Sequence, residues 1–293
     1  LKKNKKILII SGPARNGNHI LISTLDGHPQ IPYIPGEDVL LREFFSKAKD
    51  NEQKLLSKLR KLKNVDFITN MSGRYFNKWL KIENLKKSKK KIKIWSGLQK
   101  INKVSPVDYQ EHLPNLNYQG YYQFLKKQLI KIKKSKDFLN FFLIYLQALN
   151  KLTQNKKKIK KIKYEYIYAN SGLRRELFYL LNRSKNIICI APIRKFETFY
   201  FSYAKSRYKT NKIKKFVLND LWQHWKHKTI DYLLLKKKYP KQVIIVKFED
   251  LIRNHKNTSK KLCKNLKIKY SNIMEKSTFI GKKVVGNSSF KKD

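Results

Sequence analysis

Four short apolar runs divide the chain into strands that alternate with helical stretches. Residues 7–10, 187–190 and 243–246 are rich in β-branched side chains, and residues 164–168 form a weaker fourth run. Runs that are apolar on both faces are typical of strands buried inside a parallel sheet. The sequence therefore predicts an α/β fold in which a central parallel sheet is flanked by helices.

Capping residues and helical periodicity support this interpretation. The expected helices span residues 18–26, about 194–207, 219–238 and about 249–266. The last of these begins at Glu249 and Asp250, because carboxylates suit the positive end of a helix dipole. Asn170 and Ser171, which follow the fourth apolar run, are expected to cap another helix.

The stretch from about residue 45 to 163 has a different character, since lysine runs interrupt its amphipathic segments. Residues 121–129 and 138–149 have helical periodicity, and Asp137 is the expected cap of the second segment. We interpret the stretch as a helical insertion or lid within one domain that spans residues 1–293.

The chain has 293 residues, a formal net charge of +48 and 41% hydrophobic residues. This charge alone favours a nucleic acid or an anionic membrane as partner. However, Lys, Asn, Ile, Tyr and Phe are abundant together, which is typical of AT-rich coding and explains much of the excess. No specific nucleic-acid motif is present, whereas contact with a membrane surface stays open. No apolar run reaches the length of a membrane span, and two cysteines suit a reducing, cytoplasmic setting.

A candidate phosphate loop joins the first strand to the first helix. Gly12 and Gly17 have G-x-x-x-x-G spacing, which lets backbone N–H groups converge on an anion at a helix N-terminus. An ordinary tight turn is the alternative, but Arg15 adds a cation inside the loop. Nucleotide-hydrolysing loops continue with Lys and Ser or Thr, which contact phosphate and Mg²⁺. Asn18 and His19 stand there instead, so no metal ligand is expected and a P-loop kinase is disfavoured.

Residues 11–31 resemble the 5′-phosphosulfate loop of the sulfotransferases that use PAPS (3′-phosphoadenosine 5′-phosphosulfate), written P-[RK]-[SG]-G-T-[TS] with L-L-D-x-H-P downstream. The residues that match this pattern are Arg15, Gly17, Asp26, His28 and Pro29. The residues that depart from it are Asn16, Asn18 and His19. The resemblance implies a P-loop-like core in which residues 15–19 bind the phosphosulfate, with Asn18 donating through its amide. Arg15 matches the basic residue of this pattern and His19 faces the loop, so both are expected to act on the transferred group.

A second motif resembles the family's 3′-phosphate site. Arg194 follows the 187–190 strand and Ser202 comes eight residues later, with Arg207 as a further basic residue. An Arg fork and a hydroxyl suit a phosphate, although a lone Arg at a strand end is the alternative. Phe248, Glu249, Asp250 and Leu251 resemble the family's Y-E-D-L segment, in which the acidic residues start a helix.

Near the C-terminus, Gly286, Asn287 and Ser288 resemble a loop that closes over the nucleotide in bacterial members. A flexible basic tail is the alternative.

Sulfuryl transfer needs a general base, and Glu37 is the main candidate. Gly36, Glu37 and Asp38 resemble the G-E-E segment of the tyrosylprotein branch, whose glutamate is the base. Glu37 or Asp38 could instead cap the next helix. His112 is a weaker candidate, and His28 is interpreted as a contact at a helix end.

The resemblance covers residues 6–45 and 164–293 and implies a metal-independent sulfotransferase. Such an enzyme moves a sulfuryl group from PAPS to a hydroxyl of a glycan, lipid, peptide or small alcohol and releases PAP. The family's catalytic lysine has no clear match near residues 164–170. A P-loop kinase and a protein that binds polyanions or nucleic acids are the alternatives.

Overall fold

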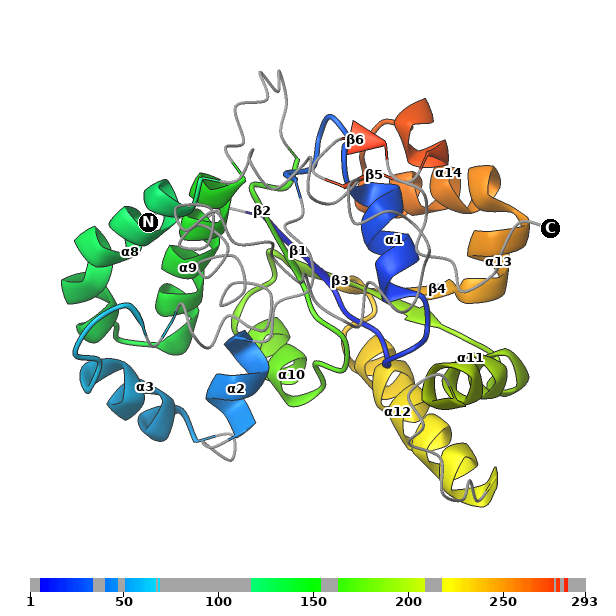
Figure 1. The fold of residues 1–293 in the computed structure, drawn as a ribbon, viewed down its shortest axis with the longest axis horizontal. Coiled ribbons are helices and arrows are strands. Elements are labelled where there is room, and N and C mark those ends of the chain that lie inside the picture. The colour runs from blue at the N-terminus through cyan, green and yellow to red at the C-terminus, as the bar shows by residue number, and fades with distance from the viewer. Residues whose placement is uncertain are drawn as a thin grey trace, which may run out of the picture.

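The computed structural model describes residues 6–33, 40–46, 51–66, 68, 117–153, 163–208, 218–276, 278–279 and 282–283 (Figure 1). A four-stranded sheet lies at its centre, in the order β2-β1-β3-β4 with every pair parallel. The strands are β1 (Ile7–Ile10), β2 (Tyr166–Ala169), β3 (Ile187–Ile193) and β4 (Val243–Lys247). The predicted fold class is thus confirmed, with β1 between two partners.

Helices pack on both faces of the sheet. They are α1 (Asn18–Leu25), α2 (Leu40–Ser46), α3 (Glu52–Arg60), α8 (Tyr118–Lys133), α9 (Phe138–Leu152), α10 (Arg175–Arg183), α11 (Phe196–Tyr208), α12 (Leu218–Lys238), α13 (Phe248–Arg253) and α14 (His255–Leu266). A 3₁₀ turn, η2 (Asn272–Glu275), precedes a short antiparallel pair, β5 (Thr278–Phe279) and β6 (Lys282–Lys283). Within the described residues, no helix combines the length and apolar character that crossing a membrane requires.

Two expectations about helix ends were wrong. The last predicted helix is two helices, because Asn254 has non-helical angles (φ −133°, ψ 53°) between α13 and α14. Asn170 and Ser171 cap no helix, since the chain first turns at Gly172 with φ +77° and α10 begins only at Arg175. The side chain of Arg174, at the N-cap of α10, makes no capping hydrogen bond.

The alternation of side chains along β1 divides the core into two layers. Ile7 and Ile9 pack in a cluster with α2, α3, α8, α9, α10 and α12, whereas Leu8 and Ile10 pack with α1, α13 and α14. Each of the four is at most 2% exposed. Complete burial of such a side chain contributes about 1.5–3 kcal/mol, so this strand anchors both layers. In Figure 1, α8 and α9 lie on one side of the sheet and α1, α13 and α14 on the other.

The described helices of the predicted insertion share the core of the sheet. Phe138 of α9 contacts the rings of Phe44 and Phe45 in α2, with centroids 5.4 and 5.2 Å away. These rings belong to the same cluster as Ile7 of β1. The cap predicted for α9 is confirmed, because the Asn140 N–H donates to Oδ1 of Asp137 at 2.7 Å.

A carboxylate on α3 joins three of these helices. Glu52 accepts hydrogen bonds from the Tyr179 hydroxyl and the Arg183 guanidinium of α10 and from the backbone N–H of Phe138. Burial alone would raise the pKa of Glu52, but these bonds together outweigh it and lower the pKa from its usual value. The charged carboxylate is therefore the form that stabilises the fold.

Replacing Glu52 with Gln should lower the free energy of unfolding by about 1 kcal/mol, a modest value because the group is partly exposed. A carboxylate with a lowered pKa stabilises the fold above the ordinary value near 4.5 and stops doing so as pH falls through the lowered pKa. Urea unfolding of both proteins at neutral and acid pH measures this difference. The difference should vanish in acid, while Asp220→Asn, a change of an exposed carboxylate on α12, should have little effect at either pH. A difference that persisted in acid would mean that the carboxylate charge is not responsible.

Candidate functional site

The loop between β1 and α1 has the backbone geometry of an anion site. Gly17 (φ +98°) and Arg15 (φ +67°) are both in the left-handed region, which is uncommon for a residue with a side chain. Such strain concentrates at functional sites, and left-handed residues turn successive N–H groups toward one side. The loop thus leads into the positive end of α1.

Close contacts with neighbouring elements explain both loop glycines. A Cβ on Gly12 would meet the Pro192 carbonyl of β3 at 2.5 Å, and one on Gly17 would overlap the ring of Phe248. The loop is therefore pressed against the end of β3 and the start of α13. This is the edge where ligands usually bind in open parallel sheets.

Asn18 braces the loop from within. Its Oδ1 accepts from the Gly12 N–H at 2.8 Å, and its Nδ2 donates to the carbonyls of Pro13 at 3.0 Å and Gly12 at 3.3 Å. The side chain is only 4% exposed. Both ends of the amide are thus engaged inside the loop, and donation from this side chain to a ligand stays a sequence-based prediction.

Asn16 connects the loop to the strand next to it. Its side chain is fully buried, and its Oδ1 accepts from the backbone N–H of Arg194 at 2.7 Å. Its Nδ2 donates to the Ala14 carbonyl at 3.0 Å. Asn16 thus holds the predicted 5′ and 3′ motifs in contact, although they are 178 residues apart in sequence.

Arg194 is a buried cation at the end of β3. It is 5% exposed, its guanidinium carbon lies 3.9 Å from the centroid of the Phe248 ring, and its Nη1 donates to the Arg15 carbonyl at 3.3 Å. Its Nε makes no hydrogen bond within the described part of the chain. A buried charge with an unused donor is costly unless an anion completes its bonding.

The charges around Arg194 have opposing effects. Burial lowers the pKa of Arg194 to about 10; Glu249 acts against this shift and Arg15 adds to it. Arg194 therefore stays protonated at neutral pH. Two guanidinium groups at one loop repel each other, and a bound anion would relieve that repulsion.

Glu249 holds the first turn of α11 in place. Its Oε1 accepts from the Lys195 N–H at 3.0 Å and from the Thr198 hydroxyl at 2.8 Å. Burial alone would raise the pKa of Glu249, but these bonds and Arg194 together lower the pKa from its usual value. The residue thus has the structural role expected of it, at the start of α13.

Ser202 lies on α11 beside the loop. Its backbone carbonyl accepts a hydrogen bond from Nη2 of Arg15 at 3.0 Å, and its side chain is partly exposed. The structure thereby brings Arg15, Asn16, Arg194 and Ser202 to one place, as the two motifs predicted.

The loop is also tied to the turn before α10. The Gly172 N–H donates to the Gly12 carbonyl at 2.9 Å, and the Leu173 N–H donates to Oγ of Ser11 at 3.2 Å. Ser11 also bonds the buried hydroxyl of Tyr232 from α12 at 2.9 Å. The turn before α10 and helix α12 thus hold the base of the loop.

The downstream D-x-H-P signature is structural. His28 is fully buried, and its Nδ1 accepts from the Gln30 N–H at 3.1 Å. Its Nε2 therefore carries the proton and donates to the Lys269 carbonyl at 2.9 Å. This confirms His28 as a contact at the end of α1.

Other predicted site residues are placed only in part. His19 is exposed in the first turn of α1. Arg207 lies on α11, but its side chain is outside the described residues. The remaining candidates also lie outside them, namely Glu37, Asp38, His112, Gly286, Asn287 and Ser288.

Sequence reasoning missed two aromatic residues of the site. Phe248 stacks on Arg194, and Nε1 of Trp225 donates to the Arg194 carbonyl at 2.8 Å. The aromatic position before Glu249 in the Y-E-D-L-like segment was the available signal for Phe248. For Trp225 the sequence offered only its spacing from Trp222.

No protein-family profile and no curated protein sequence matches the chain. Solved structures similar to it include the sulfotransferase domain of a Synechococcus olefin synthase, at 13% identity and a TM-score of 0.46, covering 93% of this chain and 77% of that one. The sulfotransferase domain of the curacin biosynthetic pathway is 14% identical with a TM-score of 0.47, covering 98% and 83%. A sulfotransferase from Mycobacterium tuberculosis is 14% identical with a TM-score of 0.43, covering 92% and 70%. All three TM-scores are below 0.5, so function has to be inferred from the site itself.

Gly17→Ala should cost more stability than Gly172→Ala, although both glycines have positive φ. A left-handed conformation costs an alanine about 1–2 kcal/mol at either position. At Gly172 a Cβ meets open space, whereas at Gly17 it also overlaps Phe248. Denaturant unfolding of the two variants measures the difference, and adding Phe248→Leu to Gly17→Ala should recover part of the loss. Equal losses at the two glycines would contradict the packing of Phe248 against the loop.

Proposed function

We propose that this chain is a sulfotransferase that transfers the sulfuryl group of PAPS to a hydroxyl group of an acceptor. The observation that carries the proposal is the buried guanidinium of Arg194, whose Nε–H is unused, next to Arg15 at a phosphate-type loop. Both cations and the loop N–H groups favour a ligand with two separate anionic groups.

PAPS has anionic groups at its 5′ and 3′ positions, and the two motifs suit one each. The loop N–H groups and Arg15 suit the 5′-phosphosulfate, which would lie at the positive end of α1. Arg194, with Ser202 on the neighbouring helix, suits the 3′-phosphate. Asn16 and Phe248 then act as positioning residues, because they hold the backbone and the guanidinium of Arg194.

The residues after Gly17 support a metal-independent reaction. A nucleotide-hydrolysing loop uses a lysine and a hydroxyl at these positions for phosphate and Mg²⁺. Here the first is Asn18, whose neutral amide closes the loop on itself, and the second is His19. A sulfuryl group carries less negative charge than a phosphoryl group, so its transfer needs less cationic compensation. Transfer without a metal therefore fits this loop better than a P-loop kinase reaction.

The chemistry assigns a role to each group. The acceptor oxygen bonds to sulfur as the bond from sulfur to the 5′-phosphate oxygen breaks, so negative charge grows on the departing phosphate. Arg15 and the loop N–H groups stabilise that charge, and His19 stands at the same helix end. Glu37 is proposed as the base that takes the acceptor proton, on the strength of its sequence motif.

Arg194→Ala should weaken binding of PAP, the nucleotide product, by about 10- to 100-fold, since charge-assisted hydrogen bonds are worth about 1.5–3 kcal/mol. Calorimetric titration with PAP measures the effect, and a thermal melt reports whether the variant is folded. Arg194→Lys should recover little affinity, because lysine lacks the planar fork that stacks on Phe248.

Arg253→Ala is the matched control, since it removes an exposed arginine from α13 and changes the net charge equally. Its PAP affinity should equal that of the wild type. Unchanged affinity in a folded Arg194→Ala protein would contradict the assignment of the 3′-phosphate site.

Glu37→Gln should keep PAP affinity but reduce turnover by about 10²–10⁴-fold, the usual contribution of one acid–base group. Turnover of PAPS with a surrogate alcohol measures this loss, and Asp38→Asn is the neighbouring control. The wild-type rate should rise with pH through the carboxylate pKa, whereas the variant rate should not. If Asp38→Asn or His112→Ala were inactive and Glu37→Gln active, the base would be misassigned.

A further inference from the structure

The solvent-facing surface of α12 presents a long row of exposed residues. Every fourth position belongs to it: Leu218, Trp222, Lys226, Ile230, Leu234 and Lys238. Each step of four residues turns about 40° around the helix axis, so this row winds slowly around α12 as it extends for about 30 Å. Leu233 and Lys237 lie beside it and are also exposed. We refer to these eight residues as the α12 stripe.

The apolar members of the stripe are large and accessible. The exposed fractions are 56% for Leu218, 39% for Ile230, 48% for Leu233 and 55% for Leu234. Trp222 is 38% exposed and stacks on Trp225 with centroids 5.1 Å apart, so its ring is held at the surface. Single exposed apolar residues are normal, but five large apolar side chains exposed on one helix indicate an interaction surface.

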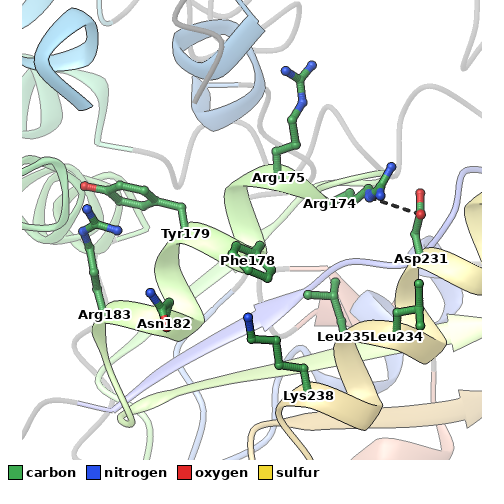
Figure 2. A pocket seen from close by; sticks show the side chains of 10 residues that line it. All are labelled: Arg174, Arg175, Phe178, Tyr179, Asn182, Arg183, Asp231, Leu234, Leu235 and Lys238. Carbon is green, nitrogen blue, oxygen red and sulfur yellow. Dashed lines mark ion pairs between the residues drawn. The ribbon is translucent and has the colours of Figure 1, made fainter. Parts of the chain in front are cut away.

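A groove between α10 and α12 widens the stripe at its C-terminal half (Figure 2). Its volume is about 640 Å³, and Leu234 and Lys238 of the stripe line it opposite Phe178 of α10. Phe178 is 45% exposed, and the Lys238 ammonium lies 4.2 Å from the centroid of its ring. Stripe and groove therefore form one surface that mixes aliphatic, aromatic and cationic groups.

The charges on this surface are mainly positive. Arg174, Arg175 and Arg183 line the groove in addition to Lys238. The carboxylate in the groove is Asp231, which pairs with Nε of Arg174 at 3.1 Å, as Figure 2 shows. Arg183 pairs with Glu52 of α3. The stripe adds two further lysines, Lys226 and Lys237, while Asp220 is an exposed acid near its N-terminal end.

We propose that the α12 stripe and the adjoining groove dock on a lipid bilayer that contains anionic lipids. Leu218, Ile230, Leu233 and Leu234 would enter the boundary between headgroups and acyl chains, where Trp222 also suits its amphipathic ring. The lysines and arginines would contact the lipid phosphates, with their aliphatic stems lying along the apolar groups.

Other occupants fit this surface less well. A soluble polyanion would satisfy the cations but would leave the leucines and the isoleucine in water. A second copy of the chain would bring Lys226, Lys237 and Lys238 against the same charges. None of the residues assigned to the nucleotide belongs to the surface, so docking can hold or fail independently of the proposed function.

Co-sedimentation with vesicles tests the proposal on the full chain. The wild type should bind vesicles of phosphatidylcholine mixed with phosphatidylserine and bind phosphatidylcholine alone only weakly. The double variant Leu233→Ser with Leu234→Ser and the double variant Lys237→Glu with Lys238→Glu should each reduce the partition coefficient by about tenfold or more. All four residues are exposed, so the fold should be kept, as a thermal melt would verify.

The controls lie on α8, which has exposed residues of the same kinds. Ile130, 68% exposed, is changed to Ser, and the exposed Lys126 and Lys127 are both changed to Glu. These variants should bind nearly as well as the wild type. The proposal is overturned if the wild type does not bind the mixed vesicles, or if charge reversal on α8 is as damaging as on α12. It is also overturned if the leucine variant binds unchanged, because the surface would then be a general polyanion site, which heparin binding would reveal.

Discussion

The site depends on keeping Arg194 charged while it is buried. Removing a guanidinium from water is costly, and the protein offsets only part of that cost. The ring of Phe248 covers one side, the Arg15 carbonyl accepts one hydrogen bond, and Glu249 contributes a nearby negative charge. The Nε–H has no partner within the described residues, and the anion that we propose as ligand would complete the bonding of this cation.

The same constraint explains the architecture around it. Gly17 has no side chain because the ring of Phe248 occupies that space. Gly12 is a glycine because the loop lies directly against the backbone at the end of β3, where a side chain would not fit. The side-chain amides of Asn16 and Asn18 form hydrogen bonds with backbone groups, and these bonds maintain the conformation of the loop without a ligand. The loop is thus preorganised, and binding energy need not be spent on ordering it.

Apolar runs predicted the sheet correctly because strands buried on both faces leave an unambiguous pattern. The two motifs also predicted that Arg15 and Arg194 meet, since parallel strands end at one edge. Other features depended on tertiary contacts that a sequence does not display. The Asn18 amide, for example, has partners inside the loop that the motif did not indicate. The break at Asn254 has no proline or glycine to signal it, and Glu37 and residues 286–288 remain sequence-based predictions.

The most direct test of the central claim is a calorimetric comparison of PAP and ATP, each in EDTA and in excess Mg²⁺. A site built from Arg15, Arg194 and a loop without a metal ligand should bind PAP equally well in both solutions. ATP should bind much more weakly, because Arg194 has no 3′-phosphate to hold. Tight ATP binding that requires Mg²⁺, with weak PAP binding, would contradict the account and favour a kinase.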